Sequence, residues 1–228
     1  MPLVFLPPVA VALTQAEPIE RAAGEVVGGL YEAACIAMVV AGLAIRAVTV
    51  GFVARNTSGR KTRQVADSLN TTAMYSLTRN PLYLGNAITY LGVALFAQNL
   101  LVGLAFALFL VVYYERIIMA EEAYLLDRFG DAYAAWARGT PAFFPRLSGW
   151  RRPALPFSLK AVLRREHHGW LAAMLALAFV EIGGDAFGHE QQAWVEPAWM
   201  AAIAAVAAIY LTIHALKRWT SLLKVTDR

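Results

Sequence analysis

Long apolar runs constrain this chain more than any other feature of its sequence. A transmembrane helix needs about 20 mainly apolar residues, and inside a bilayer the backbone must satisfy its own hydrogen bonds. Five runs are predicted to be such helices: residues 27–54, 81–97, 100–119, 168–182 and 194–216. Because 59% of the residues are hydrophobic and only 16% are charged, the sequence predicts an all-α integral membrane bundle of about five transmembrane helices.

The rest of the composition narrows the function classes. The 228 residues suit a single membrane domain, residues 1–228. The net charge is +4, but the basic residues cluster in loops beside apolar runs, which predicts membrane orientation rather than nucleic-acid binding. The single cysteine, Cys35, excludes an intrachain disulfide and any cysteine-based metal site. We therefore expect neither nucleic acid nor a metal as a partner, and we expect Cys35 to be a core residue.

Lysine and arginine predict the orientation of the bundle. They are concentrated in residues 55–80, 116–165 and 217–228. The alternate loops are acidic, and Arg21 is their one lysine or arginine. By the positive-inside rule, the N-terminus lies outside and the C-terminus lies in the cytoplasm. The apolar residues 1–14 are too short for a standard span, so we expect an interfacial or re-entrant segment there.

An amphipathic helix is predicted after the third apolar run. Leu126, Phe129, Tyr133 and Trp136 recur at steps of three and four residues and form one apolar stripe. Prolines at positions 141 and 145 end the helical pattern. Such a helix lies on the membrane or against the bundle, here on the cytoplasmic side.

A positively charged helix start is predicted where the second run begins. Asn80 is a good N-cap, and Pro81 is favoured at the first helical position. The free N–H groups of this start, with Arg79 beside it, would attract a carboxylate or phosphate. The alternative is a capped membrane helix with an arginine that reaches the interface.

Acidic residues follow the third run. Glu121 and Glu122 lie near the hydrocarbon boundary, where ionised acids are costly unless they are paired or hydrated. Their partner is either Arg116 or a ligand that carries an ammonium or sulfonium group. The alternative is an acidic helix end in contact with water.

The tight connection Gln98-Asn99 makes the second and third runs an antiparallel hairpin, so that both polar ends lie on the same side of the membrane. A ligand with a carboxylate and a fixed positive charge fits such a pair of sites, and S-adenosylmethionine is one. Attack on its methyl carbon needs orientation and exclusion of water, but neither a metal nor a protein nucleophile.

Four sequence pieces, in order, resemble the isoprenylcysteine carboxyl methyltransferase and phospholipid methyltransferase superfamily. They are Tyr75 to Gly85, Glu121-Glu122, Phe129-Gly130 to Trp136, and Pro141 to Pro145. The resemblance covers residues 57–146 as a methyltransferase-like core and leaves residues 168–216 as an additional transmembrane pair. It implies an integral membrane enzyme that binds S-adenosylmethionine on the cytoplasmic side and takes a lipid acceptor from the bilayer.

The resemblance also implies roles for individual residues. Catalytic roles fall on Glu122 and Arg79. The implied cofactor-binding residues are Tyr75, Arg79, Asn80, Pro81, Tyr83, Gly85, Glu121 and Glu122. The chain departs from the usual pattern at three positions, with Asn80 in place of His, Ala73 in place of Gly and Ala142 in place of Arg.

Three arginines are candidates for binding the acceptor. Arg46 lies inside the first run, and an intramembrane arginine is a functional candidate by default. Arg164 and Arg165 precede the fourth run. The acceptor is predicted to be lipid-like: a prenylcysteine carboxylate, a phospholipid amine or a lipid phosphate. Two other classes stay open at this point, a nucleotide-dependent membrane reductase and a non-enzymatic transporter or assembly protein.

Overall fold

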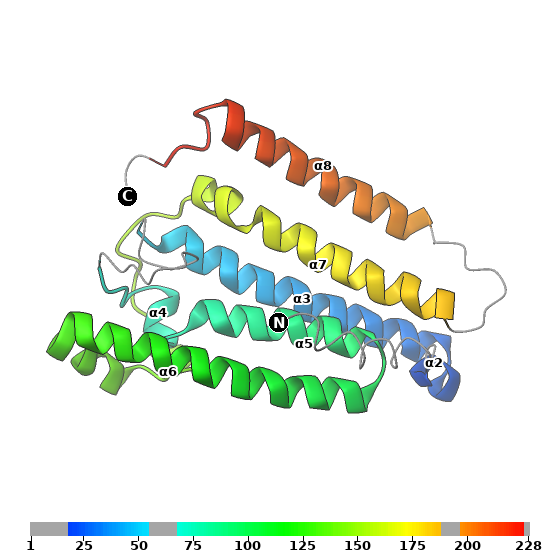
Figure 1. The fold of residues 1–228 in the computed structure, drawn as a ribbon, viewed down its shortest axis with the longest axis horizontal. Helices are drawn as coiled ribbons and strands as arrows, with labels where there is room; N and C mark the ends of the chain where they lie inside the picture. Colours follow the sequence, from blue (N-terminus) through cyan, green and yellow to red (C-terminus); the bar gives the residue numbers. More distant parts are fainter. Residues whose placement is uncertain (1–17, 55–67, 188–196, 226–228) are drawn as a thin grey trace. The chain divides into compact units, whose positions relative to one another are not determined.

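The computed structural model describes residues 18–54, 68–187 and 197–225, and the regular structure in these ranges is entirely helical (Figure 1). This confirms the all-α prediction for the described part of the chain. The elements are α2 (Pro18–Ala23), α3 (Glu25–Phe52), α4 (Met74–Leu77), α5 (Pro81–Phe96), α6 (Leu100–Gly139), the 3₁₀ helix η2 (Leu147–Gly149), α7 (Leu159–Phe187) and α8 (Pro197–Trp219).

Three helices, α3, α6 and α8, are long and apolar enough to cross a membrane by length and composition. The chain is therefore a multi-pass membrane protein. Helix α5 is apolar but has only 16 residues. Helix α7 has 29 residues, and its first turns carry charged side chains. The number of five spans stays a prediction.

Helix boundaries differ from the sequence prediction in two places. The predicted third span continues as helix to Phe129, because no proline or glycine interrupts residues 104–129, and a kink at Gly130 divides the predicted amphipathic helix, so that α6 consists of two helical segments. Helix α7 begins at Leu159, well before the predicted residue 168. The predicted interfacial segment at residues 1–14, the basic residues between positions 55 and 63, and the first residues of the fifth predicted span lie outside the described ranges.

The chain divides into two compact units, each built from segments of the same long helices. The first unit contains Met1–Ala41, Ile88–Phe109 and His167–Thr212. The second contains Gly42–Ala87, Leu110–Glu166 and Ile213–Arg228. All four sequence pieces of the family resemblance fall in the second unit.

Polar contacts around the α5–α6 connection organise the first unit. The Tyr31 hydroxyl donates to the carbonyl oxygen of Leu95 at 2.9 Å. Gln98 is buried in the connection, and its side-chain nitrogen donates to Glu32 at 3.0 Å. Cys35 is buried at 3% exposure, which confirms the expected core position. Together these contacts fix the tight hairpin that the sequence predicted.

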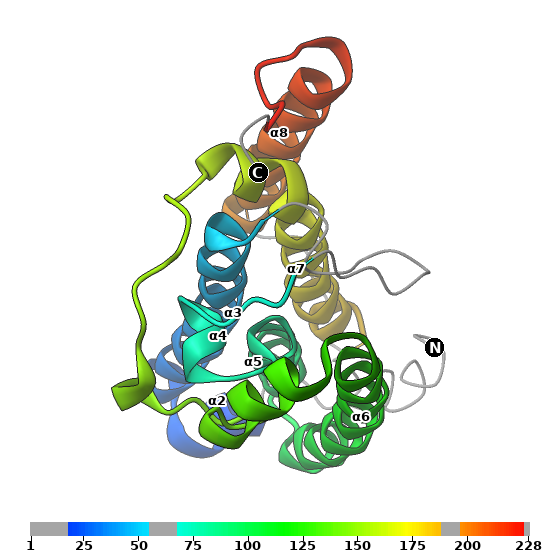
Figure 2. The ribbon, with the colours of Figure 1, turned by 90° about the vertical axis from the view of Figure 1, so that its left-hand side faces the viewer.

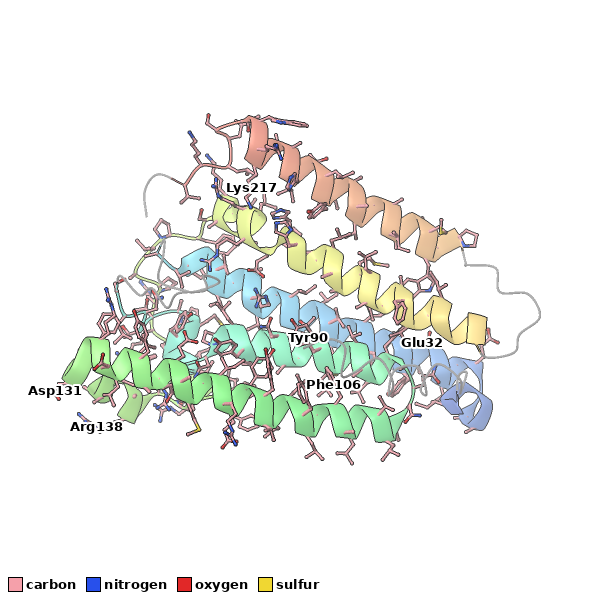
Figure 3. All side chains as sticks on the ribbon, in the orientation of Figure 1. Glu32, Tyr90, Phe106, Asp131, Arg138 and Lys217 are labelled. Atoms are coloured by element: carbon pink, nitrogen blue, oxygen red, sulfur yellow. The ribbon has the colours of Figure 1, made fainter. Side chains whose placement is uncertain are left out.

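A bend at Gly130 shapes the second unit. Gly130 has φ 51° and ψ −126° within α6, a conformation that suits glycine because side chains with a Cβ rarely adopt it. Figure 2 shows the end of α6 turned sharply away from the rest of the helix. The bend directs residues 131–139, which include Asp131 and Arg138 (labelled in Figure 3), along a new axis.

We predict that Gly130→Ala lowers the stability of the protein by about 1–3 kcal/mol, because alanine resists this backbone conformation. A Cβ at Gly130 would meet no atom within 4 Å. The loss of stability therefore reports the strain of the backbone conformation, without any steric clash. The matched control is Gly184→Ala in α7, where a Cβ also meets nothing within 4 Å and alanine is the better helix former. Thermal unfolding in detergent compares the two variants. Equal stability changes in both variants would contradict the assigned conformation.

Candidate functional site

The start of α5 lies where the sequence placed it. Pro81 begins the helix, and the Asn80 carbonyl oxygen accepts the first helical hydrogen bond, from the Leu84 N–H at 3.0 Å. The Arg79 N–H donates to the carbonyl oxygen of Pro141 at 2.8 Å. The first and last pieces of the family resemblance are thus joined through the backbone.

The Arg79 side chain forms a two-pronged ion pair with Glu122. Its Nε and Nη2 atoms each lie 2.8 Å from one oxygen of the carboxylate. The side chains are 18% and 22% exposed. The third nitrogen, Nη1, donates to the carbonyl oxygens of Ala137 at 2.9 Å and Thr140 at 3.3 Å. Arg79 therefore ties the start of α5 to α6 and to the segment after its bend.

Two of the residues that depart from the family pattern, Asn80 and Ala142, also take part in this cluster. The Asn80 amide nitrogen donates to Glu122 Oε1 at 3.2 Å and to the Ala142 carbonyl oxygen at 2.9 Å. An amide does not titrate, so the Asn80 side chain itself stays neutral over the whole pH range. Ala73 has φ 51°, which explains in physical terms why glycine is usual there.

Glu121 lies among tyrosines. The Tyr83 hydroxyl donates to Glu121 Oε2 at 2.6 Å, and the Tyr83 and Tyr114 rings lie 5.5 Å apart. Burial and the nearby Glu121 carboxylate raise the pKa of the Tyr75 phenol well above its ordinary value. Tyr75 therefore stays protonated near neutral pH.

A second buried ion pair, between Arg46 and Glu166, joins α3, α5 and α7 within the second unit. Arg46 Nε and Nη2 donate to the two oxygens of Glu166 at 2.8 and 3.0 Å, and Nη1 donates to Asn86 at 2.6 Å. The two charged side chains are 8% and 1% exposed. A Cβ on Gly85 would lie 2.8 Å from the Gly42 carbonyl oxygen, so glycine lets α5 approach α3 closely.

The two other candidate arginines belong to the same unit. The Arg164 carbonyl oxygen accepts a hydrogen bond from Lys217 at 3.5 Å. Arg165, like Arg46, lies within electrostatic range of the Tyr75 phenol. The described residues contain no group of three or more His, Cys, Asp or Glu side chains that could hold a metal.

The structure thus brings most of the predicted site residues together, with one difference in the pairing. The sequence analysis placed an anion site at Arg79 beside a cation site at the acidic pair, whereas Arg79 and Glu122 bind each other. Sequence reasoning missed Glu166 and Asn86, although each is a polar residue in an apolar helix. It also missed Tyr114, which nothing in the sequence distinguishes from other aromatic residues.

The fold and this cluster define a multi-pass helical membrane protein whose motif pieces converge in one unit. Residues 32–132 match the family model described as phospholipid methyltransferase, which confirms the resemblance for this part of the chain. No solved structure matches the chain.

Three curated relatives are similar to this chain. It is 39% identical over 111 residues to the cobalt-zinc-cadmium resistance protein CzcN of Cupriavidus metallidurans, over 48% of this chain and 49% of that protein. It is 35% identical over 111 residues to the nickel-cobalt-cadmium resistance protein NccN of Alcaligenes xylosoxydans xylosoxydans, over 48% and 50%. It is 35% identical over 77 residues to the protein-S-isoprenylcysteine O-methyltransferase of Schizosaccharomyces pombe, over 34% and 33%. The chain spans about half the length of the first two relatives and about a third of the length of the third.

We predict that Arg79→Gln and Glu122→Gln each lower stability by about 1–3 kcal/mol, since each leaves a partly buried partner without its hydrogen bonds. The double variant should lose less than the sum, with a coupling of about 1–2 kcal/mol in a double-mutant cycle. Arg128→Gln, at an exposed position of α6, is the matched control. Strictly additive losses in thermal unfolding would show that the two side chains do not depend on each other.

Proposed function

We propose that the chain is an S-adenosylmethionine-dependent methyltransferase that acts on a membrane-embedded, lipid-like acceptor. The observation that carries the proposal is the convergence of Arg79 with Glu122, and of Tyr83 with Glu121, at adjoining positions of α5 and α6. The match of residues 32–132 to the phospholipid methyltransferase family supports it.

The residues present fit such a cofactor. Among the described residues only Tyr83 donates to Glu121, and it uses Oε2, so the other oxygen can face a cationic group. Tyrosine rings add cation–π attraction, and Tyr75 and Tyr83 lie around this carboxylate. We assign Glu121, Tyr75 and Tyr83 to the positive end of the cofactor.

The remaining predicted cofactor residues form the frame of the site. Arg79 and Asn80 both donate to Glu122. Pro81 begins α5, and Gly85 permits the close approach to α3. Because both Glu122 oxygens accept hydrogen bonds from Arg79, we assign the catalytic roles expected for Arg79 and Glu122 to positioning rather than to proton transfer.

Bound S-adenosylmethionine would supply an electrophilic methyl group, which the acceptor's own nucleophilic atom attacks. The protein then orients the two reactants, balances the positive charge through Glu121 and keeps water away. Such a site needs no protein nucleophile. An anionic acceptor, a carboxylate or phosphate, needs no base either, whereas an amine acceptor must first lose a proton.

The membrane setting of the proposal follows from the charge distribution. We propose five spans with an outer N-terminus and a cytoplasmic C-terminus, so that the second unit faces the inner membrane surface. Arg164 and Arg165 remain the proposed acceptor contacts. Arg46 was expected to bind the acceptor as well, but its guanidinium is engaged by Glu166 and Asn86, so we propose that it holds helices together.

The direct test is calorimetry on the detergent-purified chain. We predict that S-adenosylhomocysteine binds and NADPH does not, and that a methyl label from S-adenosylmethionine enters a total lipid extract. Binding of NADPH alone would support the reductase class. Binding of neither S-adenosylhomocysteine nor NADPH would support a non-enzymatic protein.

Glu121→Gln tests the assignment of the cationic subsite. We predict that it weakens binding of sinefungin, whose amine cation replaces the sulfonium, by about 1–3 kcal/mol, because a charged hydrogen bond or ion pair is lost. Binding of S-adenosylhomocysteine, whose sulfur is neutral, should fall less. Equal losses for both ligands in calorimetry would remove Glu121 from the sulfonium subsite.

The names of two relatives favour a second, broader role in metal tolerance. We propose that any such role acts through a lipid that the chain modifies. Cells that express the chain should then tolerate cobalt or cadmium better than cells that express Glu121→Gln. Tight binding of either metal ion to the purified protein would contradict this route.

A further inference from the structure

Arg79, the predicted anion-binding residue, has little capacity left for a ligand. A guanidinium has five N–H donors, and four hydrogen bonds run from Arg79 to Glu122, Ala137 and Thr140. A ligand carboxylate could be held in two-pronged fashion only if one of these four hydrogen bonds broke. The carboxylate of the proposed cofactor therefore needs other donors.

Within the described ranges, two buried donors beside this ion pair make no hydrogen bond of full geometry. In the described part of the chain, Tyr133 Oη and Trp136 Nε1 are buried atoms without a hydrogen bond. Tyr133 is only 4% exposed. Burial of an unpaired polar group is costly, so such atoms are rare in folded proteins and call for an explanation. The cost is removed if a ligand accepts from both.

The position of this pair fits a ligand of the same site. The Tyr133 and Trp136 rings lie 5.6 Å apart in edge contact, on the segment that the Gly130 bend directs. Glu122 and Arg79 both lie close to the Tyr133 phenol, and Glu122 approaches the Tyr133 hydroxyl without forming a hydrogen bond of full geometry. Because Arg79 neutralises Glu122, a second carboxylate at this place does not meet an uncompensated negative charge.

We propose that Tyr133 Oη and Trp136 Nε1 donate hydrogen bonds to the carboxylate of the methyl donor's amino-acid part. An indole nitrogen only donates, so the group that satisfies Trp136 is an acceptor. A carboxylate offers two acceptor oxygens, one for each donor, and charged acceptors make the stronger hydrogen bonds. This inference rests on the proposed function and names two further binding residues for it.

The test uses two ligands that differ only in the carboxylate. Tyr133→Phe removes the hydroxyl and keeps the ring, and we predict that it weakens S-adenosylhomocysteine binding about tenfold or more. The variant should bind S-adenosyl-3-thiopropylamine, which lacks only the carboxylate, as tightly as the wild type does. Trp136→Phe should show the same selectivity. Tyr90→Phe, which removes a hydroxyl at a 47% exposed position labelled in Figure 3, is the matched control and should change neither affinity.

The outcomes separate the two proposals. If the wild-type protein binds neither ligand, the proposed function itself fails. If it binds S-adenosylhomocysteine and both variants bind that ligand unchanged, the two donors are satisfied by water and the inference is overturned. Equal weakening for both ligands would place Tyr133 and Trp136 at the adenosine part or in a structural role, which also overturns it. Titrations counted on the folded fraction keep the comparison valid for a destabilised variant.

Discussion

An ionised carboxylate at the edge of a hydrocarbon layer needs a partner, and this constraint organises the second unit of the protein. Glu122 meets it through Arg79. The same guanidinium also binds the carbonyl oxygens of Ala137 and Thr140. One side chain thus holds together the beginning of α5, the middle of α6 and the segment after the bend. Loss of either charge leaves the other with the cost of desolvation and no compensation.

Two adjacent acids have different surroundings because they are neighbours on a helix. With 3.6 residues per turn, consecutive side chains point about 100° apart. Glu122 faces Arg79 and Asn80, whereas Glu121 faces Tyr83. The first carboxylate is paired with an arginine, and the second lies beside tyrosine side chains. This division would let one short acidic motif serve both the architecture and the cationic ligand that we propose.

The bend in α6 positions both the carbonyl groups that bind Arg79 and the two donors proposed for the ligand. A straight helix would continue along its axis after Phe129. The glycine conformation at Gly130 instead turns the chain, so that carbonyl groups near its end reach Arg79. The same turn carries Tyr133 and Trp136, whose buried donors lack partners in the described structure. The position of a single glycine therefore affects both the ion pair and the donors proposed for the ligand.

The sequence predicted the features that depend on local patterns. Hydrophobic runs predicted the helices, and Asn80-Pro81 predicted where α5 starts. The hairpin geometry predicted that Arg79 and the acidic pair meet. It did not predict that Arg79 and Glu122 bind each other, because charges at two helix ends do not reveal whether their partner is a ligand or the protein. The ion pair of Arg46 with Glu166 was also missed, since the two residues are 120 positions apart and no local pattern connects them.

The most direct test of the account is an experimental structure of the full chain in a lipid nanodisc with bound S-adenosylhomocysteine. The account predicts that the ligand's sulfur lies next to Glu121 and Tyr83 while the ion pair of Arg79 with Glu122 remains intact. A ligand bound away from these residues, or an Arg79 that has left Glu122 to hold the ligand, would contradict it.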